Sequence, residues 1–579
     1  MSDRGSGGDA SRGGHGPGNR SRGGRTGASG SREHGSGGGR GGGQPGASGG
    51  KQGSGGSRGQ AGSAGRGRGS DGQTGASGGQ GRGPGGSRGG RPARPVRDEA
   101  RNVAYDLLRA VDERDAYANL LMPTLLRERR LSGRDAGLAT ELAYGTLRGL
   151  GTYDEVIAAC SDRAPEDLDP PLLDAIRLGV HQLLKTRIPP HAAVGTTVDL
   201  VRLRVGTGAS KYANAVLRKV AGRSLEQWLP IVAPDPEQDP VGHLAVAHSH
   251  PRWIVTALRD AVGGDFDETA ALLAADNERP RVTLVARPGL SSVEELLTSG
   301  AEPAHYSPYA AYLSEGDPGL IRAVAEARAA VQDEASQLVA LALTRVPVTG
   351  GDTRWLDLCA GPGGKAGLLD AIAVHGDEAA PARRGLDEEP REPYGPSGAG
   401  REPRGQQQGP GPVSFTGGAR LLAAELQYHR ARLVRQTTRE AAVITADGTV
   451  PAWRAGAFDR VMVDAPCTGL GALRRRPEAR WRRDPRSLPD LGRLQRELLT
   501  SALEAVRPGG VVAYVTCSPH LAETVTVVGD VLRRRDDVEA LDARAYLPGV
   551  EGLGEGPHAQ FWPHRHGTDG MFLALLRRG

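Results

Sequence analysis

Two cysteines stand where apolar runs of the sequence end in turn-forming residues. Cys467 follows VMVDAP and precedes Thr-Gly, and Cys517 follows VVAYVT and precedes Ser-Pro. Such runs predict buried strands, so both thiols are expected at strand exits. A thiolate that adds to an unreactive ring makes a neighbouring ring carbon nucleophilic. The pair therefore favours covalent catalysis. The alternative is that cysteines are buried as small apolar residues, which fits Cys160 in the helical run EVIAAC.

A third apolar run, WLDL, leads into a glycine-rich turn. Glycines after a strand let backbone N–H groups approach a ligand, and the helix that follows presents its positive end to it. A glycine turn alone is often only a tight connection. Here Asp357 lies in the strand, and further carboxylates are predicted at later strand ends, so an adenosine-containing ligand is favoured. The predicted binding residues are Cys359, Ala360, Gly361, Pro362, Gly363, Gly364, Lys365, Glu425, Asp447 and Asp464.

The spacing of Glu425 supports this prediction. The segment Gly376–Gly418 holds 17 Gly or Pro among 43 residues and has no apolar period, so it is predicted to be a disordered insert. Without it, Glu425 would follow Lys365 by 17 residues, close to the offset of about 20 residues for a ribose-binding carboxylate. A nucleotide-type site beside two thiols indicates methylation of carbon 5 of a pyrimidine in RNA.

Composition divides the chain of 579 residues sharply. Residues 1–90 contain 39 glycines, and no aromatic residue precedes Tyr105, so residues 1–94 are predicted to be a disordered tail. This tail carries a net charge of +11 and the whole chain +5, which leaves −6 for the remainder. The tail either contacts RNA phosphates or only aids solubility, and the sequence does not decide between the two.

Periodicity predicts three folded parts after the tail. Residues 95–229 have helical spacing throughout, for example in RNVAYDLLRAVDE. Residues 234–346 mix helices with a short strand, RVTLVA, and form a connector subdomain. Residues 347–579 alternate strands with helices, which is typical of a parallel α/β sheet.

Six arginines follow Cys467 within a short segment, with Trp481 among them, and they contrast with the acidic net charge of the folded parts. Such a run is usually a solvated face, but beside the cysteines we expect it to bind RNA phosphates. The run comprises Arg474, Arg475, Arg476, Arg480, Arg482 and Arg483.

The four cysteines form no Cys-x-x-Cys pair and no His cluster accompanies them, so neither a metal site nor a disulfide framework is predicted. No apolar stretch is long enough for a membrane helix, and the N-terminus has no apolar signal core. We therefore expect a cytoplasmic protein without membrane or metal partners, acting as a monomer.

The motifs CAGPGGK, DAPCTGLGALRRRPEARWRR and TCSP, together with VQDEASQ and DGMFLALLRR, resemble those of the Sun-type (RsmB-like) RNA 5-methylcytosine methyltransferases. The helical region resembles the NusB fold. The resemblance implies a multidomain protein with a disordered N-terminal tail. An all-α NusB-like, RNA-binding domain would precede an α/β Rossmann-like S-adenosylmethionine-dependent methyltransferase domain.

The resemblance also implies roles for single residues. Cys517 would be the nucleophile that attacks carbon 6 of cytosine, and Cys467 would assist release of the product. Glu425 would bind the ribose of S-adenosylmethionine, Asp447 would lie near its adenine, and Asp464 near its methionine end or the target base.

The implied substrate is ribosomal RNA, 16S, with an unpaired or looped target. Two alternatives stay open on the sequence. They are cytosine-C5 methylation of tRNA and a non-catalytic RNA-binding factor in ribosome assembly.

Overall fold

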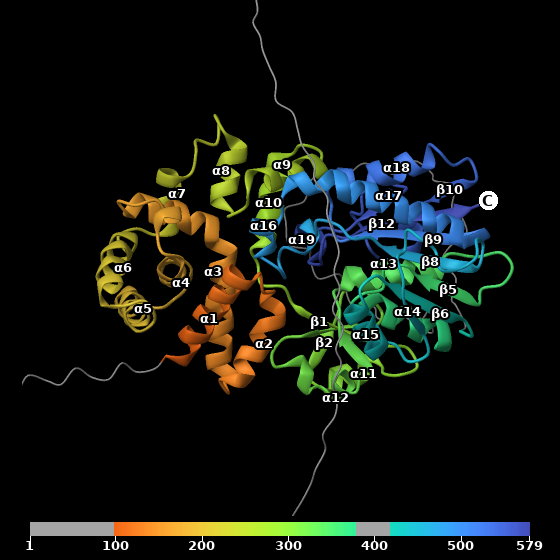
Figure 1. Cartoon of the computed structure of the whole chain (residues 1–579), viewed down its shortest axis with the longest axis horizontal. Coiled ribbons are helices and arrows are strands. Elements are labelled where there is room, and N and C mark those ends of the chain that lie inside the picture. The colour runs from red at the N-terminus through yellow and green to blue at the C-terminus, as the bar shows by residue number, and fades with distance from the viewer. Residues whose placement is uncertain (1–97, 378–416) are drawn as a thin grey trace, which may run out of the picture. The chain divides into compact units, whose positions relative to one another are not determined.

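The computed structural model describes residues 98–377 and 417–579 (Figure 1). The predicted tail, 1–94, lies outside these residues. The first described part is helical, as predicted. Its helices are α1 (Glu99–Arg114), α2 (Ala118–Glu128), α3 (Gly133–Cys160), α4 (Pro170–Lys185), α5 (Pro190–Arg204), α6 (Thr207–Val220) and α7 (Leu225–Val232).

Local sequence explains where these helices begin and which face they bury. Asp98 caps α1, because its side chain accepts a hydrogen bond from the backbone N–H of Arg101. Helix α4 begins at Pro170, where a missing N–H costs no helical hydrogen bond. The apolar stripe of α1 is buried in a cluster with residues of α3, α4 and α6.

A mixed region follows, with helices α8 (Pro240–Ala247), α9 (Arg252–Ala261), α10 (Phe266–Asp276), α11 (Val293–Thr298) and α12 (Arg322–Ala325). Its strands are β1 (Val282–Ala286), β2 (Ala301–Pro303), β3 (Ala310–Leu313) and β4 (Ala329–Val331), which pair antiparallel in the order β2-β3-β1-β4. The sequence had indicated only β1 among these strands, because the other three have only three or four residues each.

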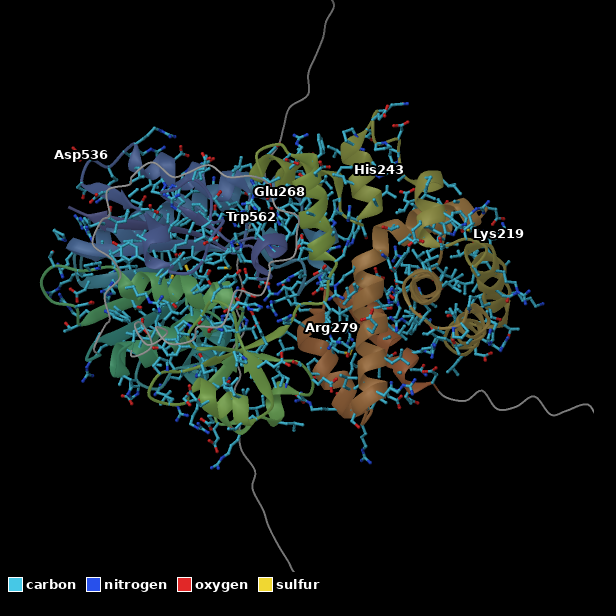
Figure 2. All side chains as sticks on the ribbon, turned by 180° about the vertical axis from the view of Figure 1, so that it is seen from behind. Lys219, His243, Glu268, Arg279, Asp536 and Trp562 are labelled. Atoms are coloured by element: carbon cyan, nitrogen blue, oxygen red, sulfur yellow. The ribbon has the colours of Figure 1, made fainter. Side chains whose placement is uncertain are left out.

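The mixed region is joined to the C-terminal part by specific contacts. Glu268 of α10 lies 2.9 Å from Nε2 of His564 in α19 (Pro563–His566). Trp562, labelled near Glu268 in Figure 2, belongs to an apolar cluster with residues of α9, α10 and the segment after Cys467. These contacts connect the mixed region to the neighbourhood of the predicted site.

The C-terminal part is built on a large sheet in the order β10-β12-β9-β8-β5-β6-β7. Its strands are β5 (Arg354–Asp357), β6 (Arg420–Glu425), β7 (Ala442–Thr445), β8 (Phe458–Asp464), β9 (Val506–Thr516), β10 (Val538–Leu541) and β12 (Phe572–Arg578), with the short β11 (Ala559–Gln560) beside β12. The five strands from β5 to β9 are parallel, as predicted. The prediction was wrong for the C-terminal edge, because β12 runs antiparallel to both of its neighbours, β9 and β10, and the sheet is mixed.

Helices cover both faces of this sheet (Figure 1). Helices α13 (Glu334–Arg345) and α14 (Gly364–His375) pack on one face, and α17 (Leu488–Ala505) and α18 (Val525–Leu532) pack on the other. The remaining helices are α15 (Tyr428–Thr437) and the short α16 (Ala479–Arg482). The central strands are buried on both faces and read as continuous apolar runs for that reason.

The predicted insert, Gly376–Gly418, has its first residues inside the body. Asp377 is buried, and its carboxylate accepts hydrogen bonds from Tyr309 and Arg345. Ala419 N–H donates to the carbonyl of Ala373 at 2.8 Å, so the chain leaves and re-enters at one place. Residues 378–416 lie outside the described residues.

None of the helices in 98–377 and 417–579 is both long and apolar enough to span a membrane. The same residues contain no group of three or more His, Cys, Asp or Glu side chains placed to bind a metal ion.

Candidate active site

The sheet order brings the predicted motifs to one edge. Strand β5 lies at the centre, with β6 and β7 on one side and β8 and β9 on the other. The connections reverse direction here, and the carboxyl ends of strands at such a point form the usual ligand site of α/β sheets. The glycine turn follows β5, Glu425 ends β6, Asp464 ends β8 and Cys517 follows β9.

The two cysteines lie in contact at this edge. Their Sγ atoms are 3.4 Å apart, although 50 residues separate them in sequence. Backbone hydrogen bonds align their loops, since Ala465 N–H donates to the carbonyl of Val515 and Gly471 N–H donates to that of Cys517. Both cysteines are half-buried as whole residues. The short separation lets one sulfur donate its proton to the other.

The surroundings of the pair make the two thiols unequal. The hydrogen bond from the Cys467 thiol lowers the pKa of Cys517, and Lys365 and Arg476 lower it further. The same hydrogen bond, together with burial and nearby negative charge, raises the pKa of Cys467. Of the two thiols, Cys517 is therefore the one that loses its proton more readily. Cys359 lies on the same edge, but burial and nearby carboxylates raise its pKa, so it stays a thiol.

An ion pair lies between the glycine turn and the cysteine loop. Lys365 Nζ is 2.8 Å from Oδ2 of Asp464, and Asp464 is the more exposed of the two. Asp464 raises the pKa of Lys365 against the opposing effect of burial. Lys365 is thereby held at the strand ends, where its positive charge also favours the thiolate form of Cys517.

Glu425 and the glycine turn support each other. Oε2 of Glu425 accepts the N–H of Gly361 and Oε1 accepts that of Gln427, both at 3.0 Å. Gly363 has a φ of +110°, and a Cβ there would lie 2.0 Å from Oγ1 of Thr437. Only glycine fits this position, and it begins α14 without a side-chain cap.

Asp447 follows β7 and is exposed. Its Oδ1 accepts hydrogen bonds from the backbone N–H and the hydroxyl of Thr449. These bonds lower the pKa of Asp447. The residue therefore stabilises a turn at the predicted edge, and in the described residues its Oδ2 has no partner.

Asp357, at the end of β5, is a site residue that the sequence did not rank among the ligands. It is almost fully buried, and neither carboxylate oxygen makes a standard hydrogen bond within the described residues. Burial, with a smaller contribution from Asp464, raises its pKa to about 7. Its acidic type inside an apolar strand was the available signal.

The arginine segment, Arg474–Arg483, differs from the prediction. Arg480 is fully buried and donates to the carbonyls of Arg148, Ser249 and Asp276 and to the side chain of Asn277. Arg482 donates to the carbonyls of Val111 and Ala116. These arginines join α1, α3 and the mixed region to the cysteine loop.

Two further arginines are also bound within the protein. Arg474 donates to the carbonyl of Gly567, and Arg475 is paired with Asp333 and Asp569. Trp481 lies against Gly151 of α3, where an added Cβ would be 2.5 Å from its ring. The prediction that the whole segment binds phosphates is therefore wrong for these residues. A buried guanidinium needs acceptors, and the folded chain supplies them.

Arg476 and Arg483 remain available. Neither guanidinium donates a hydrogen bond within residues 98–377 and 417–579; Arg476 is exposed and lies over the ring of Tyr117. Arg483 lies near Gly469, since a Cβ there would be 3.8 Å from its Nη2 and 4.0 Å from Cys517 Sγ. These two arginines are the members of the segment that a substrate can reach beside the cysteines.

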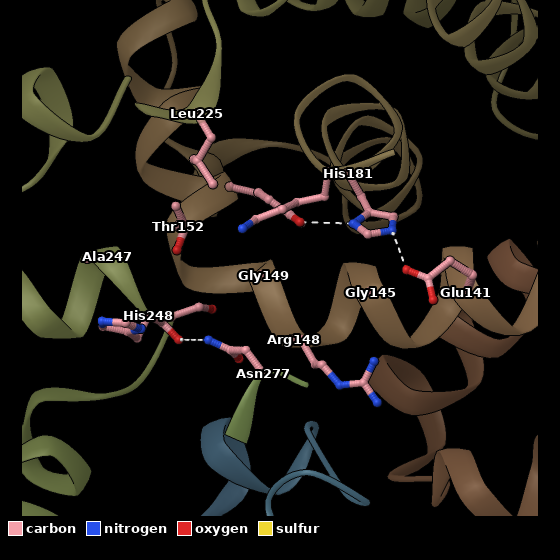
Figure 3. A pocket seen from close by; sticks show the side chains of 13 residues that line it. Glu141, Gly145, Arg148, Gly149, Thr152, His181, Leu225, Ala247, His248 and Asn277 are labelled. Carbon is pink, nitrogen blue, oxygen red and sulfur yellow. Dashed lines mark hydrogen bonds and ion pairs between the residues drawn. The ribbon is translucent and has the colours of Figure 1, made fainter. Parts of the chain in front are cut away.

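A separate cavity of about 180 Å³ lies between α3, α4 and the mixed region (Figure 3). His181 and Arg148 line it, each with one buried nitrogen that has no hydrogen-bond partner in the described residues. Burial lowers the pKa of His181 to about 3, so this imidazole is neutral. None of the predicted site residues lines this cavity.

Comparison with known proteins gives two family matches. The family model described as 16S rRNA methyltransferase RsmB/F matches residues 415–577, and the NusB family model matches residues 98–222. The first covers the cysteine loops and most of the large sheet, and the second covers the first helical part.

Individual relatives cover nearly their full lengths. A Mycobacterium tuberculosis protein named as a putative methyltransferase is 50% identical over 496 residues, which are 85% of this chain and 99% of that protein. Ribosomal RNA small subunit methyltransferase B of Pseudomonas putida is 30% identical over 494 residues, 82% of this chain and 98% of that protein. The crystal structure of PH0851 shares the fold, with a TM-score of 0.63 at 20% identity over 83% of this chain and 99% of that one.

The Rossmann-like sheet, its glycine turn and these matches define an S-adenosylmethionine-dependent methyltransferase. The chain belongs to the 16S rRNA methyltransferase RsmB/F family, in the form that carries a NusB domain before the methyltransferase domain.

Proposed function

We propose that this protein methylates carbon 5 of a cytosine in 16S ribosomal RNA through a covalent bond between Cys517 and carbon 6 of the base. The observation that carries the proposal is the contact of the two sulfurs, 3.4 Å apart, at the edge that also holds the glycine turn. The substrate class is supported by the description of the matching family and by the small-subunit methyltransferase of Pseudomonas putida.

The residues at this edge fit S-adenosylmethionine. The first turn of α14 has no side-chain cap, so its N–H groups are available to the methionine carboxylate. Asp357 offers two buried acceptor oxygens that lack standard partners in the described residues, which suits an ammonium group. The turn Cys359–Lys365 and Asp464 would bind the same end, Glu425 the ribose, and Asp447 the adenine. When bound, S-adenosylmethionine supplies an electrophilic methyl group.

The chain's own residues account for the other steps. The Cys517 thiolate forms a bond to carbon 6, which breaks the aromatic system and makes carbon 5 nucleophilic. Once Cys517 is bonded to carbon 6, its hydrogen bond and negative charge no longer raise the pKa of Cys467, and Cys467 releases its proton to solvent.

After carbon 5 has gained its methyl group, the Cys467 thiolate takes the proton from carbon 5. The electron pair of that C–H bond restores the ring double bond and expels Cys517 as a thiolate. The resting pair of one thiol and one thiolate is regenerated, and one proton has gone to solvent.

Arg476 and Arg483 are proposed to bind phosphates next to the target base. The base must leave any stack to reach the sulfurs, so an unpaired or looped cytosine is expected. Methylation of tRNA and a purely structural role in assembly have no specific observation in their favour.

The test is transfer of a labelled methyl group to undermodified 16S ribosomal RNA, with nucleoside analysis for 5-methylcytosine. Cys517→Ala should lower the rate by about 10⁴-fold or more, the size expected when a covalent nucleophile is removed. Cys160→Ala, at a buried cysteine of α3, is the matched control and should keep near-normal turnover. Near-normal turnover of Cys517→Ala would contradict the proposal.

A further inference from the structure

A fully buried carboxylate, that of Glu523, lies next to the two cysteine loops. Glu523 belongs to a short 3₁₀ turn, Leu521–Glu523, between β9 and α18. Oε1 accepts the N–H of Thr468 at 2.8 Å and the amide of Gln495 at 3.2 Å. Oε2 accepts the hydroxyls of Thr468 and Ser518, at 2.5 and 2.7 Å.

The partners of Glu523 are the immediate neighbours of the cysteines. Thr468 follows Cys467 directly, and Ser518 follows Cys517 directly. Their two hydroxyls lie 3.0 Å apart over the same carboxylate. Gln495 adds a third link, because its amide also donates to the carbonyl of Pro466, just before Cys467. One side chain thus connects both cysteine loops to α17.

The environment of Glu523 is unusual for a residue with only a packing role. Within residues 98–377 and 417–579, its carboxylate is bound by uncharged donors and makes no ion pair with Lys or Arg. Burying a carboxylate is costly unless hydrogen bonds replace the water that it gives up, and here four donors do so. An apolar residue would fill the same space at lower cost, so the arrangement indicates a requirement for these particular bonds.

We propose that Glu523 is the positioning residue of the cysteine pair and sets the separation of the two sulfurs by binding the residue that follows each cysteine. Its importance in catalysis rests on the proposed function, but the sulfur separation is a property of the fold alone. Without Glu523, the loops after β8 and β9 lose the carboxylate that they share, although the backbone bonds along the strands remain.

The catalytic consequence falls on one step in particular. Attack by Cys517 on carbon 6 requires only that sulfur, whereas removal of the carbon 5 proton requires Cys467 at a fixed place beside it. Loss of Glu523 should therefore slow product release more than adduct formation. A general loss of folded protein would lower both steps equally and would not cause an adduct to accumulate.

The sulfur separation can be tested without any RNA. Diamide removes two electrons and two protons from a pair of thiols and forms a disulfide, which requires the sulfurs to approach about 2.05 Å. The rate of Cys467–Cys517 disulfide formation in the full-length protein is followed by mass spectrometry of tryptic peptides. Glu523→Ala should form this disulfide at least about tenfold more slowly than wild type, since small displacements have large effects on such rates.

Two variants make the result specific. Glu497→Ala removes a carboxylate of α17 that does not contact the cysteine loops and should react at the wild-type rate. Glu523→Gln keeps the shape, and the hydroxyls of Thr468 and Ser518 can turn to accept from its amide. The rate of disulfide formation in Glu523→Gln should therefore lie within about threefold of the wild-type rate. A Gln variant as slow as the Ala variant would overturn a role based on hydrogen-bonded position.

If Glu523→Ala does not fold, the double variant Thr468→Val with Ser518→Ala replaces it, because it removes the two hydroxyl donors and leaves the carboxylate. Disulfide formation at the wild-type rate in the folded variant would overturn the proposal. With ribosomal RNA and S-adenosylmethionine, the same variant should accumulate a covalent protein–RNA adduct. If the proposed function fails, the disulfide rates still decide the role of Glu523.

Discussion

The arginine segment, Arg474–Arg483, follows the Cys467 loop in sequence, but the polar atoms of the cysteine loops and of this segment have different partners. Each cysteine sulfur has only the other sulfur as a hydrogen-bond partner in the described part of the chain. Arg474, Arg475, Arg480 and Arg482 instead donate to carbonyl or carboxylate oxygens of the protein. Arginines whose guanidinium groups already have acceptors in the protein are not available to phosphates, whereas Arg476 and Arg483 are.

The comparison also shows how the two regions depend on each other. Arg480 and Arg482 tie the segment after Cys467 to α1, α3 and the mixed region. Glu523 ties the same loop to the loop after Cys517. The charged residues that contact only protein therefore hold in place the residues that are open to substrate.

The largest effect on stability is expected at Arg480. Arg480→Ala leaves several buried carbonyls without donors, so the free energy of unfolding should fall by about 3 kcal/mol or more. Arg480→Lys should lower the free energy of unfolding almost as much, because one ammonium group cannot reach all the acceptors of a guanidinium.

Arg476→Ala is the matched control for this variant, since its guanidinium is exposed, and it should change stability by less than about 0.5 kcal/mol. Denaturant unfolding of the three variants measures both effects. Equal stability of Arg480→Ala and Arg476→Ala would remove the distinction between buried and available arginines.

The outcome at the arginines shows where sequence reasoning ends. The sequence indicated the helical first part, the α/β second part, and the strand exits at which the cysteines, the glycine turn and the carboxylates lie, because apolar periodicity and turn residues act locally. It could not indicate that Arg480 is buried, because its acceptors lie on Arg148, Ser249, Asp276 and Asn277, more than 200 residues away.

The antiparallel edge and the role of Glu523 were missed for related reasons. Strand β12 reads as an ordinary apolar run, and only its pairing with β9 sets its direction. Glu523 reads as one acidic residue in a turn, and its function depends on donors brought from two separate loops. The assignment of single residues to S-adenosylmethionine stays a prediction.

The available arginines should affect RNA binding instead of stability. Changing Arg476 and Arg483 together to Ala should weaken binding to ribosomal RNA, most at low salt. For an unpaired target, the slope of log affinity against log salt should become shallower by about 0.7 for each phosphate that the variant no longer neutralises. Binding measured across salt concentrations gives this slope.

Arg486→Ala serves as the control for that measurement, because Arg486 is exposed but already paired with Asp484. It should leave the slope nearly unchanged. A double variant of Arg476 and Arg483 with the slope of wild type would show that these arginines do not contact phosphates.

A smaller effect is expected at Asp357 and depends on pH. Its pKa is raised by burial from 3.8 to about 7 in the folded protein. The folded state therefore holds a proton that the unfolded state gives up between about pH 4 and pH 7, and stability falls as pH rises through this window. Above about pH 7 Asp357 is ionised in both states, and the loss of stability no longer changes with pH.

Asp357→Asn should remove this loss of stability, because the amide does not titrate. Without S-adenosylmethionine, the variant should gain stability relative to wild type as the pH rises from about 4 to about 7, as measured by melting temperature. A stability difference that does not change with pH would show that the Asp357 carboxyl titrates normally.

If Cys517 bonds to the base and Cys467 releases it, the covalent bond should be trapped when Cys467 is removed. Cys467→Ala is incubated with undermodified 16S ribosomal RNA and S-adenosylmethionine, and the mixture is resolved on a denaturing gel. The account predicts a protein–RNA band that resists denaturation, contains methylated cytosine, and is absent from the Cys467→Ala, Cys517→Ala double variant. The absence of any such band from Cys467→Ala under methylating conditions would contradict the account.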